Sequence, residues 1–166
     1  MSCPTILATS MPGRDSWALE ELMDTVMSRD PRAEVRATRY RGVFEVYTSL
    51  SPRDAAALFL LYQHAFLASV VPVMSCSDLR GLPAALGSLL RGLSGPVRLV
   101  VRAREPMKDS LTEELVRNLV RSAGLPISDR AEVELVVESI DYRVVMSVGQ
   151  PRRCGPHCTV LVPVLQ

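Results

Sequence analysis

The sequence predicts an α+β protein built in two successive parts. Runs rich in β-branched residues alternate with segments whose apolar residues recur every three or four positions. A chain of 166 residues can hold two small domains, and a short polar joint at residues 75–78 offers a place to divide it. We therefore expect domains at residues 1–75 and 76–166, packed together and each with its own sheet.

The first part has the order strand, helix, strand, strand, helix, strand. The expected elements are a strand at Thr5–Ser10, a helix capped by Asp15 or Ser16, a hairpin turning near residues 40–42, a helix from Ser51 to about Leu67, and a buried strand at Ser69–Met74. This βαββαβ order is the split βαβ arrangement of ferredoxin-like folds. Such a fold says little about function by itself.

The second part has the order helix, helix, strand, helix, strand, strand. Glycines and a proline weaken the segment LRGLPAALGSLLRGL, which predicts two short helices or one interrupted helix. The later elements are a strand at Val97–Ala103, a helix with a Ser110/Glu113 capping box, and a hairpin made by Glu132–Glu138 and Tyr142–Val148. An apolar run at Thr159–Leu165 follows as a tail.

The charged residues are balanced overall but unusual in kind. The net charge is +1, and Lys108 is the one lysine among nineteen basic residues. Arginine makes planar, bidentate contacts with phosphate and stacks on bases, so this excess fits RNA binding. Genome base composition or a thermophilic source would produce the same excess.

A basic loop at the end of the Val97–Ala103 strand is the first candidate site. Arg102, Arg104 and Lys108 precede the expected helix start at Ser110. Guanidinium groups beside the free N–H groups of a helix N-terminus form a phosphate site. The alternative is that Arg104 pairs with a neighbouring acid, Glu105 or Asp109, and only keeps the loop soluble.

Two further arginines are candidate RNA contacts. Arg121 lies on the exposed face of the helix that follows the basic loop and has no acidic partner at helical spacing. Arg117 follows Glu113 by four residues, the favourable spacing for an ion pair, so a solvated helix face is its expected role. Arg41 is beside Tyr40 at the tip of the first hairpin, where basic and aromatic residues together suit single-stranded RNA, although a plain turn is the simpler interpretation.

The cysteines predict no metal site. Cys154, His157 and Cys158 bring three soft ligands together, but a zinc site usually needs a second closely spaced pair, which is absent. A Cys154–Cys158 disulfide remains open, particularly in a hyperthermophile, with free thiols as the default. We expect both cysteines to be dispensable for RNA binding, and His64 to be packed rather than catalytic.

The sequence predicts a protein that is not an enzyme and needs no cofactor. It has no Gly-rich phosphate loop, GxSxG, dinucleotide fingerprint or HExxH motif, and no pair of carboxylates stands out as an acid/base dyad. The apolar stretch Ala55–Met74 is interrupted at Gln63–His64 and by Pro72, so we interpret it as a buried helix and strand, not a membrane span. With no secretory leader visible, we expect a cytoplasmic protein without membrane or DNA partners.

The chain resembles THUMP-domain proteins in the order and spacing of its segments. The similar segments are LATSMPGRDSWALEELMD, TRYRGVFEVYTSL, VVPV and RAREPMKDSLTEELV, and the resemblance covers about residues 4–149. It implies an N-terminal ferredoxin-like domain followed by a THUMP domain (ααβαββ), which together hold the acceptor end of tRNA. The most similar type lacks a catalytic domain and presents tRNA to an RNA cytidine acetyltransferase.

Two other functions remain open at this point. The chain could be the RNA-binding subunit of a split tRNA thiolation or methylation enzyme, which a neighbouring catalytic gene would favour. It could instead be a ferredoxin-like interaction or metal-binding module centred on Cys154 and Cys158, which metal analysis of the purified protein would reveal.

Overall fold

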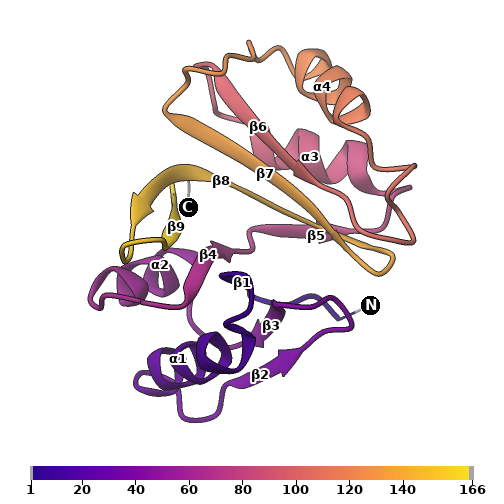
Figure 1. The fold of residues 1–166 in the computed structure, drawn as a ribbon. Coiled ribbons are helices and arrows are strands. Elements are labelled where there is room, and N and C mark those ends of the chain that lie inside the picture. Colours follow the sequence, from indigo (N-terminus) through magenta and orange to yellow (C-terminus); the bar gives the residue numbers. More distant parts are fainter. Residues whose placement is uncertain (1, 165–166) are drawn as a thin grey trace. The chain divides into compact units, whose positions relative to one another are not determined.

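A computed structural model describes residues 2–164, which cluster into two compact units (Figure 1). The N-terminal unit contains residues 4–73 together with residues 151–164. The central unit contains residues 74–150 and the two residues that precede Pro4. The mixture of helices and strands confirms the α+β class. Within residues 2–164, no helix is long and apolar enough to cross a membrane.

The N-terminal unit is a five-stranded sheet with two helices. Its elements are β1 (Ile6–Ser10), α1 (Asp15–Met27), β2 (Glu34–Ala37), β3 (Val43–Tyr47), α2 (Pro52–Leu60), β4 (Leu67–Pro72) and β9 (Thr159–Pro163). The strand order is β2-β3-β1-β4-β9, with β1 antiparallel to β3 and β4, and with β9 parallel to β4. The hairpin predicted near residues 40–42 is confirmed by the β2–β3 pairing.

The core of this unit is one buried cluster to which both strands and helices contribute. Ile6 and Ala8 of β1 pack in one buried cluster with Leu22 of α1 and Phe59 of α2. Alternate strand residues point to one face of a sheet, and residues three or four apart share a face of a helix. The cluster also contains Val160 from β9, so the C-terminal strand is part of this core.

Helix α2 ends at Leu60, seven residues before the predicted end. The Glu21 side chain from α1 accepts hydrogen bonds from the backbone N–H groups of Ala65, Phe66 and Leu67. These bonds replace the helical partners that the backbone would otherwise need. His64 therefore lies in a loop after the helix, where it is buried as expected.

The C-terminal boundary also differs from the prediction. Residues 76–166 were expected to form the second domain, but residues 151–164 cluster with the N-terminal unit. The reason is the parallel pairing of Ser69 with Thr159 and of Val70 with Val160. An apolar run gives no sign of the strand it will pair with, so the sequence could not assign this segment.

The central unit contains β5 (Ser75–Ser77), α3 (Leu82–Leu90), β6 (Val97–Arg102), α4 (Glu113–Ser122), β7 (Val133–Ile140) and most of β8 (Arg143–Arg153). Strand β6 is parallel to β7, and β8 is antiparallel to both β7 and β5. The expectation of two separate sheets is wrong. Strand β8 extends beyond its predicted end at Val148 into the other unit, so the hydrogen-bonded strands form a single mixed sheet.

Two local predictions in the central unit are also wrong. The polar joint at residues 75–78 contains strand β5, and α3 is one continuous helix, so the order ααβαββ is not observed. Gly87 is tolerated inside α3, where an added Cβ would meet nothing within 4 Å. Helix α4 is capped by Thr112, whose side chain accepts the N–H of Leu115, and not by Ser110.

The lowered pKa of Asp30 predicts how the stability of the N-terminal unit depends on pH. The hydrogen bond from the Thr48 hydroxyl, followed by that from the Ser49 N–H, lowers the pKa of Asp30 below its ordinary value of 3.8. A lowered folded-state pKa stabilises the fold at neutral pH, and this contribution is lost as pH falls through that pKa. We expect Asp30→Asn to reduce the free energy of unfolding at pH 7 and to match the wild type once the pH is below the lowered pKa of Asp30.

Urea denaturation across this pH range would test the expectation. Asp129→Asn, which changes an exposed acid, is the control and should have a small effect at every pH. A deficit in Asp30→Asn that stayed constant down to acid pH would show that the carboxylate charge is not responsible.

Candidate nucleic-acid interface

The basic loop between β6 and α4 is held by two buried apolar residues. Met107 and Leu111 are buried, and the N–H of Leu111 donates to the carbonyl of Met107. The residues between them face outward, and Lys108 and Ser110 are exposed. The loop therefore presents a lysine and a hydroxyl to solvent from a backbone that is fixed at both ends.

Arg102 and Arg104 are occupied by one buried carboxylate. Glu138 of β7 lies beside Arg102 in the parallel register, with an Nη1–Oε2 distance of 3.1 Å. Arg104 reaches the other oxygen of Glu138 at 2.9 Å. The side chain of Glu138 is 1% exposed, whereas those of Arg102 and Arg104 are 41% and 16% exposed.

This pairing sets the charge of the loop. Neither Glu105 nor Asp109, the acids considered from the sequence, is the carboxylate that the structure places against Arg104 at 2.9 Å. The Glu138 carboxylate offsets part of the positive charge of these two guanidinium groups. The more exposed Arg102 can contact a phosphate while Glu138 holds it in place, since a guanidinium has five donors. Arg104 also donates to the carbonyl of Ser139, so its main role is to hold the loop to β7.

Helix α4 adds one cation in its last turn, at the end away from the loop. Arg117 is paired with Glu113 at 2.8 Å, as the i,i+4 spacing predicts. Arg121, in the last turn, is exposed and makes no ion pair among residues 2–164. Lys108 is likewise exposed and unpaired within the described chain. Both are exposed cations that a phosphate could approach without displacing an acid, as are Arg80, Arg91 and Arg130 of the same unit.

Arg41 belongs to the N-terminal unit, whereas the basic loop belongs to the central unit. Its Nε is 3.4 Å from a carboxylate oxygen of Asp15, and 89% of its side chain is exposed. Both residues line a surface cavity of about 530 Å³, together with Ser10, Gly13 and Gly42. The carboxylate of Asp15 makes this cavity a poorer phosphate site than its arginine suggests.

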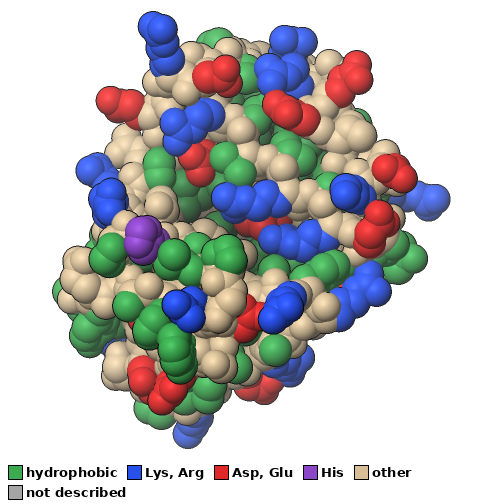
Figure 2. Space-filling model, viewed as in Figure 1, with side chains coloured by type: hydrophobic (Ala, Val, Ile, Leu, Met, Phe, Trp, Pro, Cys, Tyr) green, Lys and Arg blue, Asp and Glu red, His purple; other side chains and the backbone are tan. Residues whose placement is uncertain are grey.

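The distribution of charge fits local contacts better than a broad electrostatic surface. On the face shown in Figure 2, Lys and Arg side chains are interspersed with Asp and Glu side chains. This agrees with the net charge of +1. An anionic ligand would therefore meet a few positioned cations on this face and not a continuous basic surface.

Glu138 is the site residue that sequence reasoning missed. Arg98 and Arg102 are four apart in β6, and Glu134 and Glu138 are four apart in β7. The parallel register pairs Arg98 with Glu134 and Arg102 with Glu138. The matching spacing was a usable signal, but it becomes informative only when the two strands are known to be neighbours in this register.

The cysteines form two disulfides, not the free thiols expected by default. Cys3 is bonded to Cys76, and Cys154 is bonded to Cys158. Disulfides are typical of oxidising compartments and of intracellular proteins from hyperthermophiles. His64, rather than the neighbouring His157, is the histidine that the fold brings to Cys154 and Cys158.

Comparison with known proteins identifies solved structures of similar fold but no family. No protein-family model matches the chain, and no curated protein matches it. The fold is similar to that of a 4-thiouridine synthetase solved with RNA and bound ATP, at 13% identity and a TM-score of 0.55, over 89% of this chain and 41% of that chain.

Two other solved structures share the fold. One is PH1313 from Pyrococcus horikoshii, at 15% identity and a TM-score of 0.65, over 90% of this chain and 55% of that chain. The other is TrmN from Thermus thermophilus, at 23% identity and a TM-score of 0.53, over 86% of this chain and 44% of that chain. The chain thus spans about half the length of the structures it matches.

Proposed function

We propose that this protein is a tRNA-binding adaptor of the THUMP type, without catalytic activity of its own, which presents the acceptor end of tRNA to a modifying enzyme. The observation that carries the proposal is a fold shared, over 89% of the chain, with a 4-thiouridine synthetase that was solved in complex with RNA. An RNA cytidine acetyltransferase is the partner that the sequence resemblance favours.

The topology of the N-terminal unit supports the ferredoxin-like assignment within this proposal. Its element order is βαββαβ, and β1 lies between β3 and β4 with antiparallel pairing to both. The cations of the central unit support the RNA surface. Lys108 and Arg121 are exposed and make no ion pair within residues 2–164, so they can bind phosphate. Glu138 holds Arg102 at the end of β6.

A second candidate is the RNA-binding subunit of a split thiolation or methylation enzyme. One observation favours it: the fold of this chain matches part of a 4-thiouridine synthetase, which is itself a thiolation enzyme. The two functions share the RNA surface and differ in the partner. Identifying the protein that copurifies with this chain and tRNA would separate them.

The RNA surface predicts a defined dependence of binding on salt. Each neutralised phosphate releases counterions and adds about 0.7 to the log–log slope of affinity against salt for single-stranded contacts. We expect Lys108→Ala and Arg121→Ala each to lower the slope by about that amount and to weaken all tRNAs nearly equally. Filter binding or fluorescence anisotropy with total tRNA over a range of salt concentrations would measure these slopes.

Arg117→Ala is the matched control, because it removes an arginine from the same helix whose charge Glu113 already neutralises. It should change the slope less than Arg121→Ala does. Unchanged slopes for Lys108→Ala and Arg121→Ala would place the RNA surface elsewhere. A wild-type protein that bound no tRNA at low salt would remove the proposal.

A further inference from the structure

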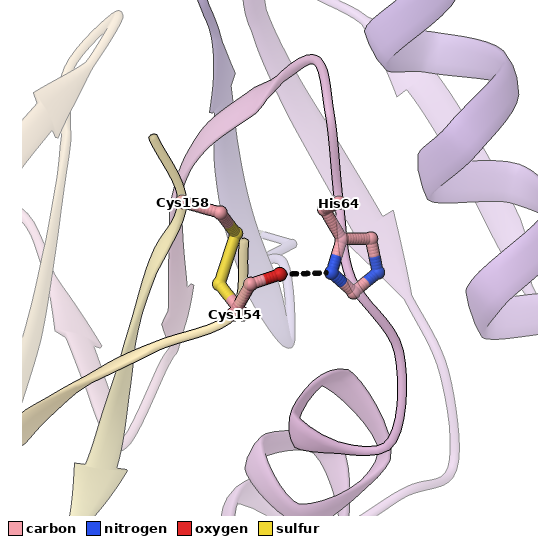
Figure 3. A group of neighbouring side chains, drawn as sticks. All are labelled: His64, Cys154 and Cys158. Atoms are coloured by element: carbon pink, nitrogen blue, oxygen red, sulfur yellow. Dashed lines mark hydrogen bonds between the residues drawn. A yellow bond between two sulfur atoms is a disulfide. The ribbon is translucent and has the colours of Figure 1, made fainter. Parts of the chain in front are cut away.

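Three potential metal ligands from distant parts of the sequence meet inside the N-terminal unit. The ligand atoms of His64, Cys154 and Cys158 lie within 4.8 Å of one another, and each residue is 1% exposed (Figure 3). Four-coordinate zinc with Zn–S and Zn–N distances near 2.3 and 2.0 Å separates its ligands by about 3.4–3.8 Å. Once the S–S bond is open, movements of about 1 Å would complete such a set.

The cysteines are held near His64 by contacts that do not depend on the disulfide. The N–H of Cys154 donates to the carbonyl of Cys158, and the N–H of His64 donates to the carbonyl of Cys154 at 2.7 Å. Gly155 packs so closely that an added Cβ would lie 2.0 Å from the carbonyl oxygen of His64. Reduction would therefore leave two thiols beside the imidazole.

The hydrogen bonds of His64 allow the proton arrangement that a metal requires. Nδ1 faces the cysteines and lies 2.9 Å from the Cys154 carbonyl, which can only accept, so Nδ1 carries a proton in the disulfide form (Figure 3). Nε2 lies 3.1 Å from the Thr25 hydroxyl, which can itself donate to the Glu21 carbonyl. Thr25 can thus accept a hydrogen bond from an Nε2–H group, and that tautomer of His64 would free Nδ1 to bind a metal.

We propose that the reduced protein binds a thiophilic metal ion, with Zn²⁺ as the probe, through Cys154, Cys158 and Nδ1 of His64. A dithiol supplies two electrons and two protons, breaks the Cys154–Cys158 bond and becomes a disulfide itself. Zinc then displaces both thiol protons, and a water molecule takes the fourth position. The site goes beyond the RNA-binding role and does not depend on it.

The experiment is a zinc measurement on the full chain with and without a dithiol reductant. After removal of free metal, we expect about one zinc per reduced chain and almost none per oxidised chain. Cobalt substitution should give thiolate-to-metal charge-transfer absorption, which reports sulfur ligation directly. Cys154→Ser/Cys158→Ser should abolish both signals, and His64→Gln should weaken zinc binding more than roughly tenfold.

Matched variants separate this site from the other cysteines and histidine. The reduced Cys3→Ser/Cys76→Ser variant should still bind zinc. It can be compared directly with the reduced wild type, because the Cys3–Cys76 disulfide is absent from both proteins under these conditions. His157→Gln, at an exposed position in the same turn, should also retain zinc. Reduced wild-type protein that stays folded by circular dichroism and holds no zinc would overturn the proposal, as would equal zinc content in Cys154→Ser/Cys158→Ser.

Discussion

Replacing Cys3 and Cys76 with serine should lower the free energy of unfolding by about 4 kcal/mol. The two cysteines are 73 residues apart, and the loop they close contains the whole segment from β1 to β4. Cross-linking so long a loop removes a large conformational entropy from the unfolded chain, which stabilises the folded state. Urea denaturation under non-reducing conditions, monitored by circular dichroism, would measure the difference.

The second disulfide is an internal control for this mechanism. Cys154 and Cys158 are four residues apart, so the same entropy model assigns their bond about 2 kcal/mol. Cys154→Ser/Cys158→Ser should therefore cost roughly half as much as Cys3→Ser/Cys76→Ser. An equal or larger cost for the short loop would show that local packing, and not loop closure, determines the contribution of these bonds.

Glu138→Gln should destabilise the protein by about 3 kcal/mol and at the same time strengthen its binding to RNA. Removing one partner of a buried ion pair leaves an uncompensated charge, and the lower end of the usual cost applies because Arg102 is partly hydrated. The amide keeps the shape of the side chain, so the lost charge is the main change. Without the Glu138 carboxylate, the guanidinium groups of Arg102 and Arg104 also attract phosphate more strongly than they do in the wild type.

The RNA part of this expectation is measured by the same salt titration. Loss of one negative charge at the loop should steepen the log–log slope by up to about 0.7. Glu134→Gln is the control: Glu134 pairs with Arg98 in the same two strands but is more exposed, and its loss should cost about 1 kcal/mol. A destabilised Glu138→Gln protein with an unchanged slope would mean that the ion pair is structural and lies outside the RNA surface.

The local elements of the fold follow from short-range signals in the sequence. The strand composition of TILATS predicted β1, and the Ser51-Pro52 start predicted α2, whose Ser51 side chain does accept the N–H of Asp54. The β2–β3 hairpin and the Glu113–Arg117 pair were predicted equally well. Propensity, capping and i,i+4 spacing act over a few residues, so one sequence suffices to recognise them.

The tertiary structure decided everything that joins residues far apart. Helix α2 ends at Leu60, and the backbone N–H groups of residues 65–67 donate hydrogen bonds to the Glu21 side chain instead of continuing the helix. The C-terminal apolar run pairs with β4 as strand β9. The fold also paired Arg102 and Arg104 with Glu138, so that Lys108 is the exposed loop cation without an acidic partner within residues 2–164.

The candidate sites show the same division. The sequence by itself determined which residue types could bind phosphate or metal and on which element each would lie. Only the fold brought His64 to Cys154 and Cys158, some ninety residues away, and assigned Arg41 and the basic loop to different units. The physical reason is that strand register and loop docking depend on the burial of complementary surfaces across the whole chain, and no local pattern encodes those surfaces.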